Sequence, residues 1–180
     1  MAIQKEFEDF VRAKNKEATE KPRVDWDARK AAWIKQVNGL YDKISVLLSD
    51  YIDKGTISVA RNPVQIAEER LGTYSVDELS IEIGENTVRL VPVGTIIIGA
   101  SGRVDLIGER GRVRVILTDP EAGSRSADIK ILKPGQRPPD SRPVDLNVLE
   151  WKLVSDPPDV KIRELTRTSL FEAILAVANE

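Results

Sequence analysis

The residue best placed for chemistry in this chain is Asp105, which lies in the stretch GRVDLIGERGRVRVILTD at residues 102–119. The stretch alternates apolar and polar residues on either side of a glycine-bounded turn, which predicts a β-hairpin. With Gly108–Gly111 as a four-residue turn, Asp105 faces Arg114 on the second strand. An acid in the middle of a strand is either a metal ligand or half of an ion pair. The facing arginine favours an exposed ion pair at the surface.

The same stretch locally resembles the metal-binding hairpin of the PD-(D/E)xK nuclease superfamily. That family places an acid on one strand and a Glu-x-Lys on the next, so that carboxylates hold Mg²⁺ and the lysine assists the attacking water. Here the second strand carries Ile-Leu-Thr at 116–118 in that place. A Glu-x-Lys does occur further along, at Glu150 and Lys152. A site made of Asp105, Glu150 and Lys152 would require the later strand to lie beside Asp105.

The chain contains no cysteine and no histidine. Their absence excludes thiol nucleophiles, Ser-His-Asp triads, imidazole acid–base catalysis and ordinary zinc sites. Disulfides are also excluded, so cysteine usage gives no indication of secretion. We therefore expect a non-enzymatic protein with no cofactor and no metal, located in the cytoplasm.

The N-terminal stretch is charged and amphipathic, unlike a signal peptide. No part of the sequence approaches the roughly 18 consecutive apolar residues of a membrane span. The formal net charge is −2, from 27 Lys and Arg against 29 Asp and Glu. A general nucleic-acid binder usually carries an excess of basic residues, because phosphate neutralisation supplies its affinity. Membrane contact is therefore not expected, and nucleic acid is only an alternative partner.

Basic residues are concentrated in one region of the chain. Residues 100–142 contain nine Lys and Arg against six Asp and Glu. Within the hairpin they could form a patch for an acidic partner, although no aromatic residue lies among them for base stacking. The alternative is an ordinary solvated sheet face. The candidate partner-binding arginines are Arg103, Arg110, Arg112 and Arg114.

Two helices are predicted before the strands. Residues 2–19 place Ile3, Phe7, Phe10 and Val11 at helical spacing, with Lys14 one turn on. Pro22 then disfavours helix in the residue before it.

The second helix is predicted to begin after Asp25, a good N-cap, and to end near Lys54, before Gly55. Its apolar stripe is wider than a coiled-coil seam and favours packing within the chain over a coiled-coil dimer. Gly39 costs about 1 kcal/mol in a helix interior relative to alanine, and we expect it to mark a close approach to a neighbour. Trp26, near the helix start, is predicted to be an exposed anchor for a partner. The stripe consists of Trp33, Ile34, Val37, Leu40, Tyr41, Ile44, Leu47, Leu48 and Tyr51.

The strands are predicted from residue 79 onward. Residues 56–76 lack a clear period and are compatible with a strand, a short helix and a loop. A two-residue turn at Glu85-Asn86 would pair Ile83 with Val88. Further strands are predicted at residues 95–100, 127–132 and 147–154, followed by a helix over 170–178 with a capping box from Ser169 to Glu172.

These patterns predict an α+β protein with two N-terminal helices, a mainly antiparallel sheet of five to seven strands and a short C-terminal helix. Residues 1–55 are expected to form a helical arm, and residues 56–180 a β-rich domain that includes the C-terminal helix. The leading functional hypothesis is a non-enzymatic protein-interaction module, such as an immunity protein, an inhibitor or an accessory subunit of a larger bacterial or phage system. The alternatives are a divergent or degenerate Mg²⁺-dependent nuclease-like domain, and a self-assembling structural protein that forms a homo-oligomer through its helical arm.

Overall fold

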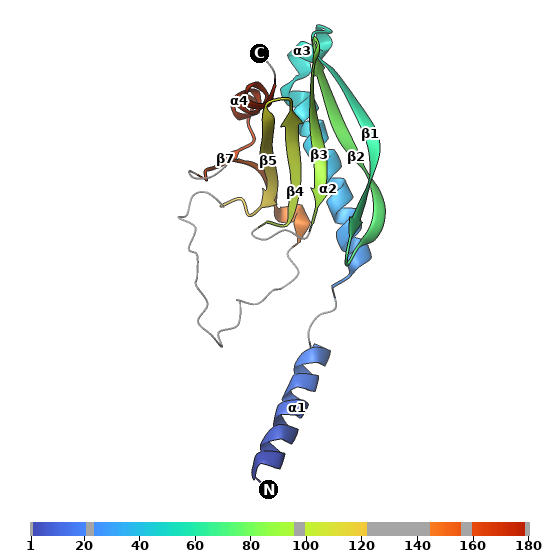
Figure 1. Ribbon diagram of the computed structural model, residues 1–180, viewed down its shortest axis with the longest axis vertical. Coiled ribbons are helices and arrows are strands. Elements are labelled where there is room, and N and C mark those ends of the chain that lie inside the picture. Colours follow the sequence, from blue (N-terminus) through green and yellow to red (C-terminus); the bar gives the residue numbers. More distant parts are fainter. Residues whose placement is uncertain (1, 21–23, 96–99, 122–144, 156–159, 179–180) are drawn as a thin grey trace.

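The computed structural model describes residues 2–20, 24–95, 100–121, 145–155 and 160–178. Within them the chain is an α+β protein, as predicted, with one seven-stranded antiparallel sheet at the upper end of the predicted range (Figure 1). The elements in chain order are α1 (Ala2–Glu20), α2 (Trp26–Leu47), α3 (Ser49–Asp53), β1 (Ser58–Glu68), β2 (Gly72–Ile83), β3 (Asn86–Gly94), β4 (Gly102–Gly108), β5 (Gly111–Thr118), a 3₁₀ turn (Leu146–Val148), β6 (Glu150–Val154), β7 (Ile162–Glu164) and α4 (Arg167–Val177).

The sheet is a meander in which each strand pairs with its neighbours in sequence, in the order β1 to β7. Helix α2 lies against one face of the sheet, which we call the inner face, behind the strands in Figure 1. The apolar residues of the strands alternate with polar ones, as the period of two requires. The inner face and the helices α2 and α4 therefore share a single hydrophobic core.

Helix α2 begins where the sequence predicts, because the Asp25 side chain accepts a hydrogen bond of 2.9 Å from the Ala28 backbone N–H. Its wide apolar stripe packs within the chain, as expected, and covers the inner face of the sheet. The helix is interrupted at Leu48, so that its last turns form the separate helix α3. The fully buried side chains of α2 are those of Trp33, Val37, Leu40, Tyr41 and Ile44.

Helix α1 lies apart from this core. Figure 1 shows it projecting from the end of the molecule where α2 begins. The side chains of Ile3 and Phe7 are 82% and 64% exposed, and Phe10 is 57% exposed. The predicted arm of residues 1–55 is thus divided in the structure: α2 is part of the core, and α1 lies outside it.

Of the strand, short helix and loop with which residues 56–76 were compatible, the structure has strand β1, a turn at residues 69–71 and the start of β2, and no short helix. Strands β1 and β2 pair along eleven residues, from Ser58 opposite Glu82 to Glu68 opposite Gly72. Pro63 obscured the strand in the sequence, because proline cannot donate to a sheet ladder. It is tolerated because β1 is an edge strand with one side unpaired in the described sheet.

The register predicted for the next hairpin is wrong by one turn position. Ile83 pairs with Asn86 and Ile81 with Val88, so the turn is Gly84-Glu85. Gly84 has φ 60°, a conformation that glycine adopts without steric cost at the first position of a two-residue hairpin turn. The glycine, and not the asparagine, therefore sets the register.

The β4–β5 hairpin has the predicted register, with Asp105 opposite Arg114 and Gly108 opposite Gly111. Strand β6 corresponds to the strand predicted at 147–154, although Leu146–Val148 forms a 3₁₀ turn before it. Residues 96–99 of the strand predicted at 95–100, and all of the strand predicted at 127–132, lie outside the described residues.

The C-terminal helix begins earlier than predicted. Thr166 is the N-cap of α4, and its capping box is completed by Ser169 and not by Glu172. The Ser169 side chain accepts the Thr166 backbone N–H at 2.9 Å and donates to the Glu164 carbonyl at 2.7 Å. A serine replaces the usual Glu or Gln of the box, which explains why the sequence pattern pointed three residues too late.

Two glycine-to-alanine changes test this packing. A Cβ at Gly102 would lie 2.9 Å from Cε3 of the buried Trp33 ring, whereas nothing lies within 4 Å of a Cβ at Gly39. We expect Gly102→Ala to lower the free energy of unfolding by about 2 kcal/mol, and Gly39→Ala to raise it by up to about 1 kcal/mol. Urea unfolding of the two variants measures both, and equal effects would contradict the packing of Trp33 on β4.

Tyr41 makes the free energy of unfolding depend on pH in the alkaline range. Its hydroxyl donates to the carbonyls of Asp77 at 2.8 Å and Leu90 at 3.2 Å. Burial, and then the nearby charges of Asp77 and Glu78, hold the pKa of Tyr41 well above its ordinary value of 10. A folded-state pKa above the unfolded value gives stability that is present below pH 10 and lost as the pH rises further.

We therefore expect Tyr41→Phe to be less stable at pH 7, because two hydrogen bonds are lost, but to lose less additional stability between pH 9 and 11 (roughly one unit either side of the tyrosine value). Tyr51→Phe, at an exposed tyrosine, is the control and should keep the alkaline loss of the original chain. Identical pH profiles for all three proteins would show that Tyr41 does not govern this behaviour.

Candidate functional site

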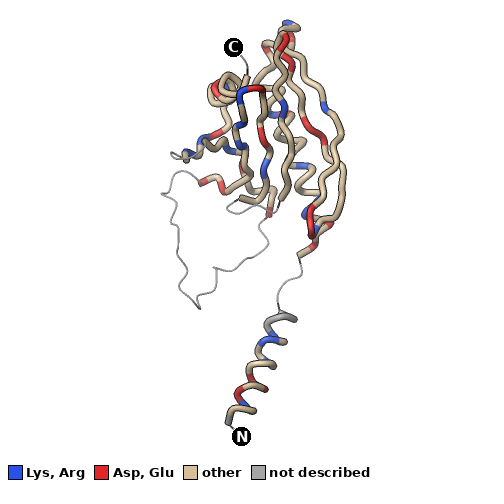
Figure 2. Tube along the Cα trace, viewed as in Figure 1, with Lys and Arg blue, Asp and Glu red and all other residues tan. Residues whose placement is uncertain are grey.

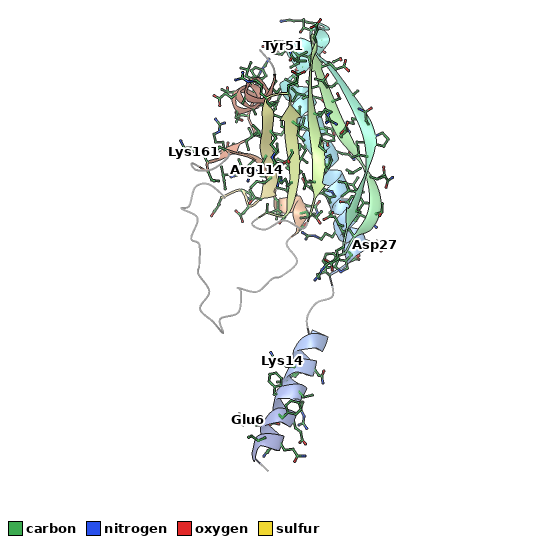
Figure 3. The ribbon with its side chains drawn as sticks, in the orientation of Figure 1. Glu6, Lys14, Asp27, Tyr51, Arg114 and Lys161 are labelled. Carbon is green, nitrogen blue, oxygen red and sulfur yellow. The ribbon has the colours of Figure 1, made fainter. Side chains whose placement is uncertain are left out.

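The hairpin arginines lie on the outer face of the sheet, the face away from α2. Arg103 and Asp105 on β4 alternate with core residues, as do Arg112 and Arg114 on β5. Figure 3 shows Arg114 over the middle strands of this face. The hairpin therefore has an apolar inner side and a charged outer side.

Asp105 is buried, so the prediction of an exposed ion pair is wrong. The residue is only 4% exposed, and its carboxylate accepts hydrogen bonds from Nε and Nη2 of Arg103 at 2.6 and 2.7 Å. Nη1 of Arg112 lies 3.7 Å from the same carboxylate. Arg103 and Asp105 are two residues apart on one strand, so their side chains share a face and meet in a bidentate pair. The carboxylate of Asp105 is thus engaged by two arginines.

The structure does not place Glu150 and Lys152 beside Asp105. Strand β5 lies between β4 and β6, so the later strand is not the neighbour that a nuclease-like site would require. Lys152 is 4% exposed and its Nζ donates to the Pro120 carbonyl, while Glu150 is exposed opposite Thr118. Within the described ranges, no group of three or more Asp and Glu side chains is placed to hold a metal ion.

The five predicted partner-binding residues fall into two separate places. Arg103, Arg112 and Arg114 share the outer face, and Arg110 lies in the adjoining turn, where its backbone N–H donates to the Val177 carbonyl at 2.9 Å. Trp26 is at the start of α2, at the other end of the molecule. Its ring is half-buried, with the Arg70 guanidinium 5.3 Å from the ring centre. Trp26 is therefore a packing residue in part, and not the freely exposed anchor that was predicted.

The outer face carries both signs of charge. Figure 2 shows acidic and basic positions side by side along the strands. Besides the Asp105 cluster, Arg89 lies 3.4 Å from Glu78. A phosphate-binding surface draws its affinity from neutralising phosphates with unopposed cations, so the mixture of acids and bases weakens the nucleic-acid alternative.

A second polar cluster was not anticipated from the sequence. Glu68, at the end of β1, accepts hydrogen bonds from the Tyr74 hydroxyl at 2.5 Å and from the Thr95 backbone N–H at 2.9 Å. Burial, and then the hydrogen bond and charge of Glu68, raise the pKa of Tyr74. The cluster links the start of the sheet to the end of β3. No local pattern could have indicated it, because Glu68 and Thr95 are 27 positions apart.

Helix α1 carries several exposed apolar side chains along one side. Ile3, Phe7, Phe10 and Val11 follow one side of the helix and are between 39% and 82% exposed. Lys14 continues this line, with its ammonium 5.8 Å from the centre of the Phe10 ring. We call these five residues the α1 stripe. An amphipathic helix with no core to cover is a surface suited to a protein partner.

No family model matches the chain, and no curated protein or solved structure matches it. No described helix is long and apolar enough to cross a membrane. The class of the protein is therefore described from its structure alone: it is an α+β protein with a seven-stranded meander and a projecting N-terminal helix.

The role of Asp105 is tested by stability and metal binding together. Asp105→Ala would leave Arg103 without its carboxylate, and we expect a loss of about 2–3 kcal/mol in the free energy of unfolding, below the full cost for a buried pair because Arg103 keeps 21% exposure. Asp42→Ala removes a comparable contact to Arg61 of 2.6 Å at a carboxylate that is 74% exposed. It should cost less than about 1 kcal/mol.

The nuclease-like alternative makes the opposite prediction. It requires Mg²⁺ or Mn²⁺ to raise the melting temperature of the original chain, and Asp105→Ala to abolish that shift at little cost in stability. Differential scanning fluorimetry with and without the metal, on both proteins, separates an ion-pair role from a metal-binding role.

Proposed function

We propose that this chain is a non-enzymatic protein-interaction module that binds its partner through helix α1. The observation that carries the proposal is the α1 stripe, an apolar surface on a helix that lies outside the core. Phenylalanine side chains bury about 150–250 Å² each, and apolar burial contributes about 25 cal/mol per Å². Phe7 and Phe10 could therefore supply several kcal/mol of binding free energy, the role of central residues in a protein interface.

The charges on α1 favour a protein partner over a membrane surface. Residues 2–20 contain four basic and five acidic side chains. Helices that lie on membranes are usually rich in Lys and Arg, which attract anionic lipids. A nearly neutral helix with two phenylalanines instead fits an apolar groove on another protein.

The rest of the molecule supports a binding role. The carboxylate with the best position for chemistry, Asp105, is held by two arginines. A rigid sheet domain that carries a projecting helix suits an immunity protein, an inhibitor or an accessory subunit of a larger bacterial or phage system. A cytoplasmic location is part of this proposal.

The proposal predicts that α1 variants lose binding but not folding. Phe7→Ala with Phe10→Ala should weaken binding of the partner by tenfold or more, since interface aromatics commonly contribute above 1.4 kcal/mol each. The free energy of unfolding should stay unchanged because both side chains are outside the core. Lys5→Ala with Arg12→Ala, on the other side of α1, is the matched control and should keep binding.

The experiment has two parts. Proteins that co-purify with the tagged chain from its source cells, including untagged copies of the chain itself, are identified for the original and both double variants. Affinity for each purified candidate is then measured by calorimetry. Equal binding by the original chain and the stripe variant would refute the role of α1, and catalytic turnover that a single acid-to-alanine change abolishes would refute the non-enzymatic function.

A further inference from the structure

A groove runs between α2 and the last strands of the sheet. Its volume is about 510 Å³, which is within the range of about 300–1,000 Å³ typical of binding pockets. It is lined by three residues of α2, by residues 149–151 at the start of β6 and by residues 164–165 at the end of β7. The residues that the argument below uses are Gln36, Gly39, Lys43, Glu150, Trp151 and Leu165.

Gly39 is the unusual residue of this groove. It lies in the interior of a 22-residue helix, where glycine costs about 1 kcal/mol relative to alanine. The sequence suggested that it marks a close approach, yet nothing lies within 4 Å of a Cβ built there, and the residue is exposed. Within the described chain, therefore, no neighbour accounts for the glycine. A close approach to Gly39 would have to come from a group that enters the groove.

The α1 stripe has the spacing that the α2 side of the groove requires. Ile3, Phe7 and Phe10 are separated by four and then three residues, and Gln36, Gly39 and Lys43 by three and then four. When two helices pack antiparallel, one series is read in reverse, so the two spacings coincide. Phe10 then lies beside Gln36, Phe7 beside Gly39, and Ile3 beside Lys43. Helices pack at 8–10 Å depending on the side chains at the contact, and a glycine opposite Phe7 leaves room for the ring.

The same register brings opposite charges together. Lys14 is one turn beyond Phe10. In this register it therefore approaches the end of the groove on the N-terminal side of Gln36. Glu150 lines the same groove next to Trp151, whose Nε1 donates to the Gln36 carbonyl at 3.1 Å. Glu150 is exposed and has no ion-pair partner among the described residues. The groove thus offers a carboxylate to the lysine that continues the α1 stripe, and the lining residues Trp151 and Leu165 are 7% and 4% exposed.

We propose that the groove binds helix α1 of a second copy of this chain, so that two copies exchange their arms in a symmetric dimer. This inference rests on the proposed function and names the partner as the chain itself. The direction of α1 favours exchange over closure within one copy, because the helix projects away from the sheet and from the rest of α2 (Figure 1). Exchange of an identical element is a low-cost route to a dimer, and the two-fold symmetry gives two equal helix–groove contacts.

The chain has no cysteine, so a pair of introduced cysteines reports one contact without background. Phe7→Cys combined with Gly39→Cys should form a disulfide in mild oxidant, seen as a covalent dimer on a non-reducing gel. Phe7→Cys combined with Ala31→Cys, an exposed position of α2 outside the groove, is the control and should stay reduced. A disulfide within a single chain, or none, would overturn the exchanged dimer.

A second variant blocks the groove without disturbing the fold. Gly39→Leu adds a side chain where the structure has open space, and leucine is a better helix former than glycine. We expect light scattering to show a dimer for the original chain and a monomer for Gly39→Leu, with unfolding stability at least maintained. Ala31→Leu should remain a dimer. Equal masses for the original chain and Gly39→Leu would refute the inference.

These outcomes separate the inference from the proposed function. If the original chain is monomeric at every concentration, and the stripe variant still loses a different protein partner, then the groove proposal fails while the binding role of α1 stands. If the stripe variant changes neither self-association nor any other binding, both proposals fail.

Discussion

The packing of α2 across the inner face of the sheet is the interaction on which the other parts of the structure depend. Trp33 is at its centre, fully buried, with its ring close to the backbone of Gly102 and 5.9 Å from the ring of Trp151. These residues come from α2, β4 and β6, so one side chain joins the helix to two strands of the sheet. The core then extends to α4, whose Val177 packs at the β4–β5 turn.

The sequence predicted those elements whose signals are local. The N-cap at Asp25, the apolar stripe of α2 and the hairpin between Gly108 and Gly111 depend on residues a few positions apart, and each was correctly predicted. The wrong predictions came from residues that are compatible with two different local structures. Pro63 indicated a break although an edge strand tolerates it, and Asn86 suggested a turn position that Gly84 fills with a positive φ.

The candidate site was less predictable, because it depends on which strands become neighbours. The sequence predicted correctly that Asp105 lies opposite Arg114, but it did not indicate that the carboxylate is buried and contacts Arg103 and Arg112. The position of β5 between Asp105 and Lys152 is likewise a property of the meander. The exposure of α1 could not be deduced either, since an amphipathic pattern predicts an apolar side without saying what covers it.

The meander order of the strands also bears on how the chain folds. Each strand pairs with the one before it in sequence, so most of the sheet contacts close short loops. Proteins rich in such local contacts have low contact order and fold faster than β-proteins with long-range pairings. During synthesis, β1 and β2 can pair as soon as their hairpin has emerged, and later strands add to a free edge one at a time. Helix α2 is made before any strand, and so its apolar stripe is already available as the surface on which the growing sheet assembles.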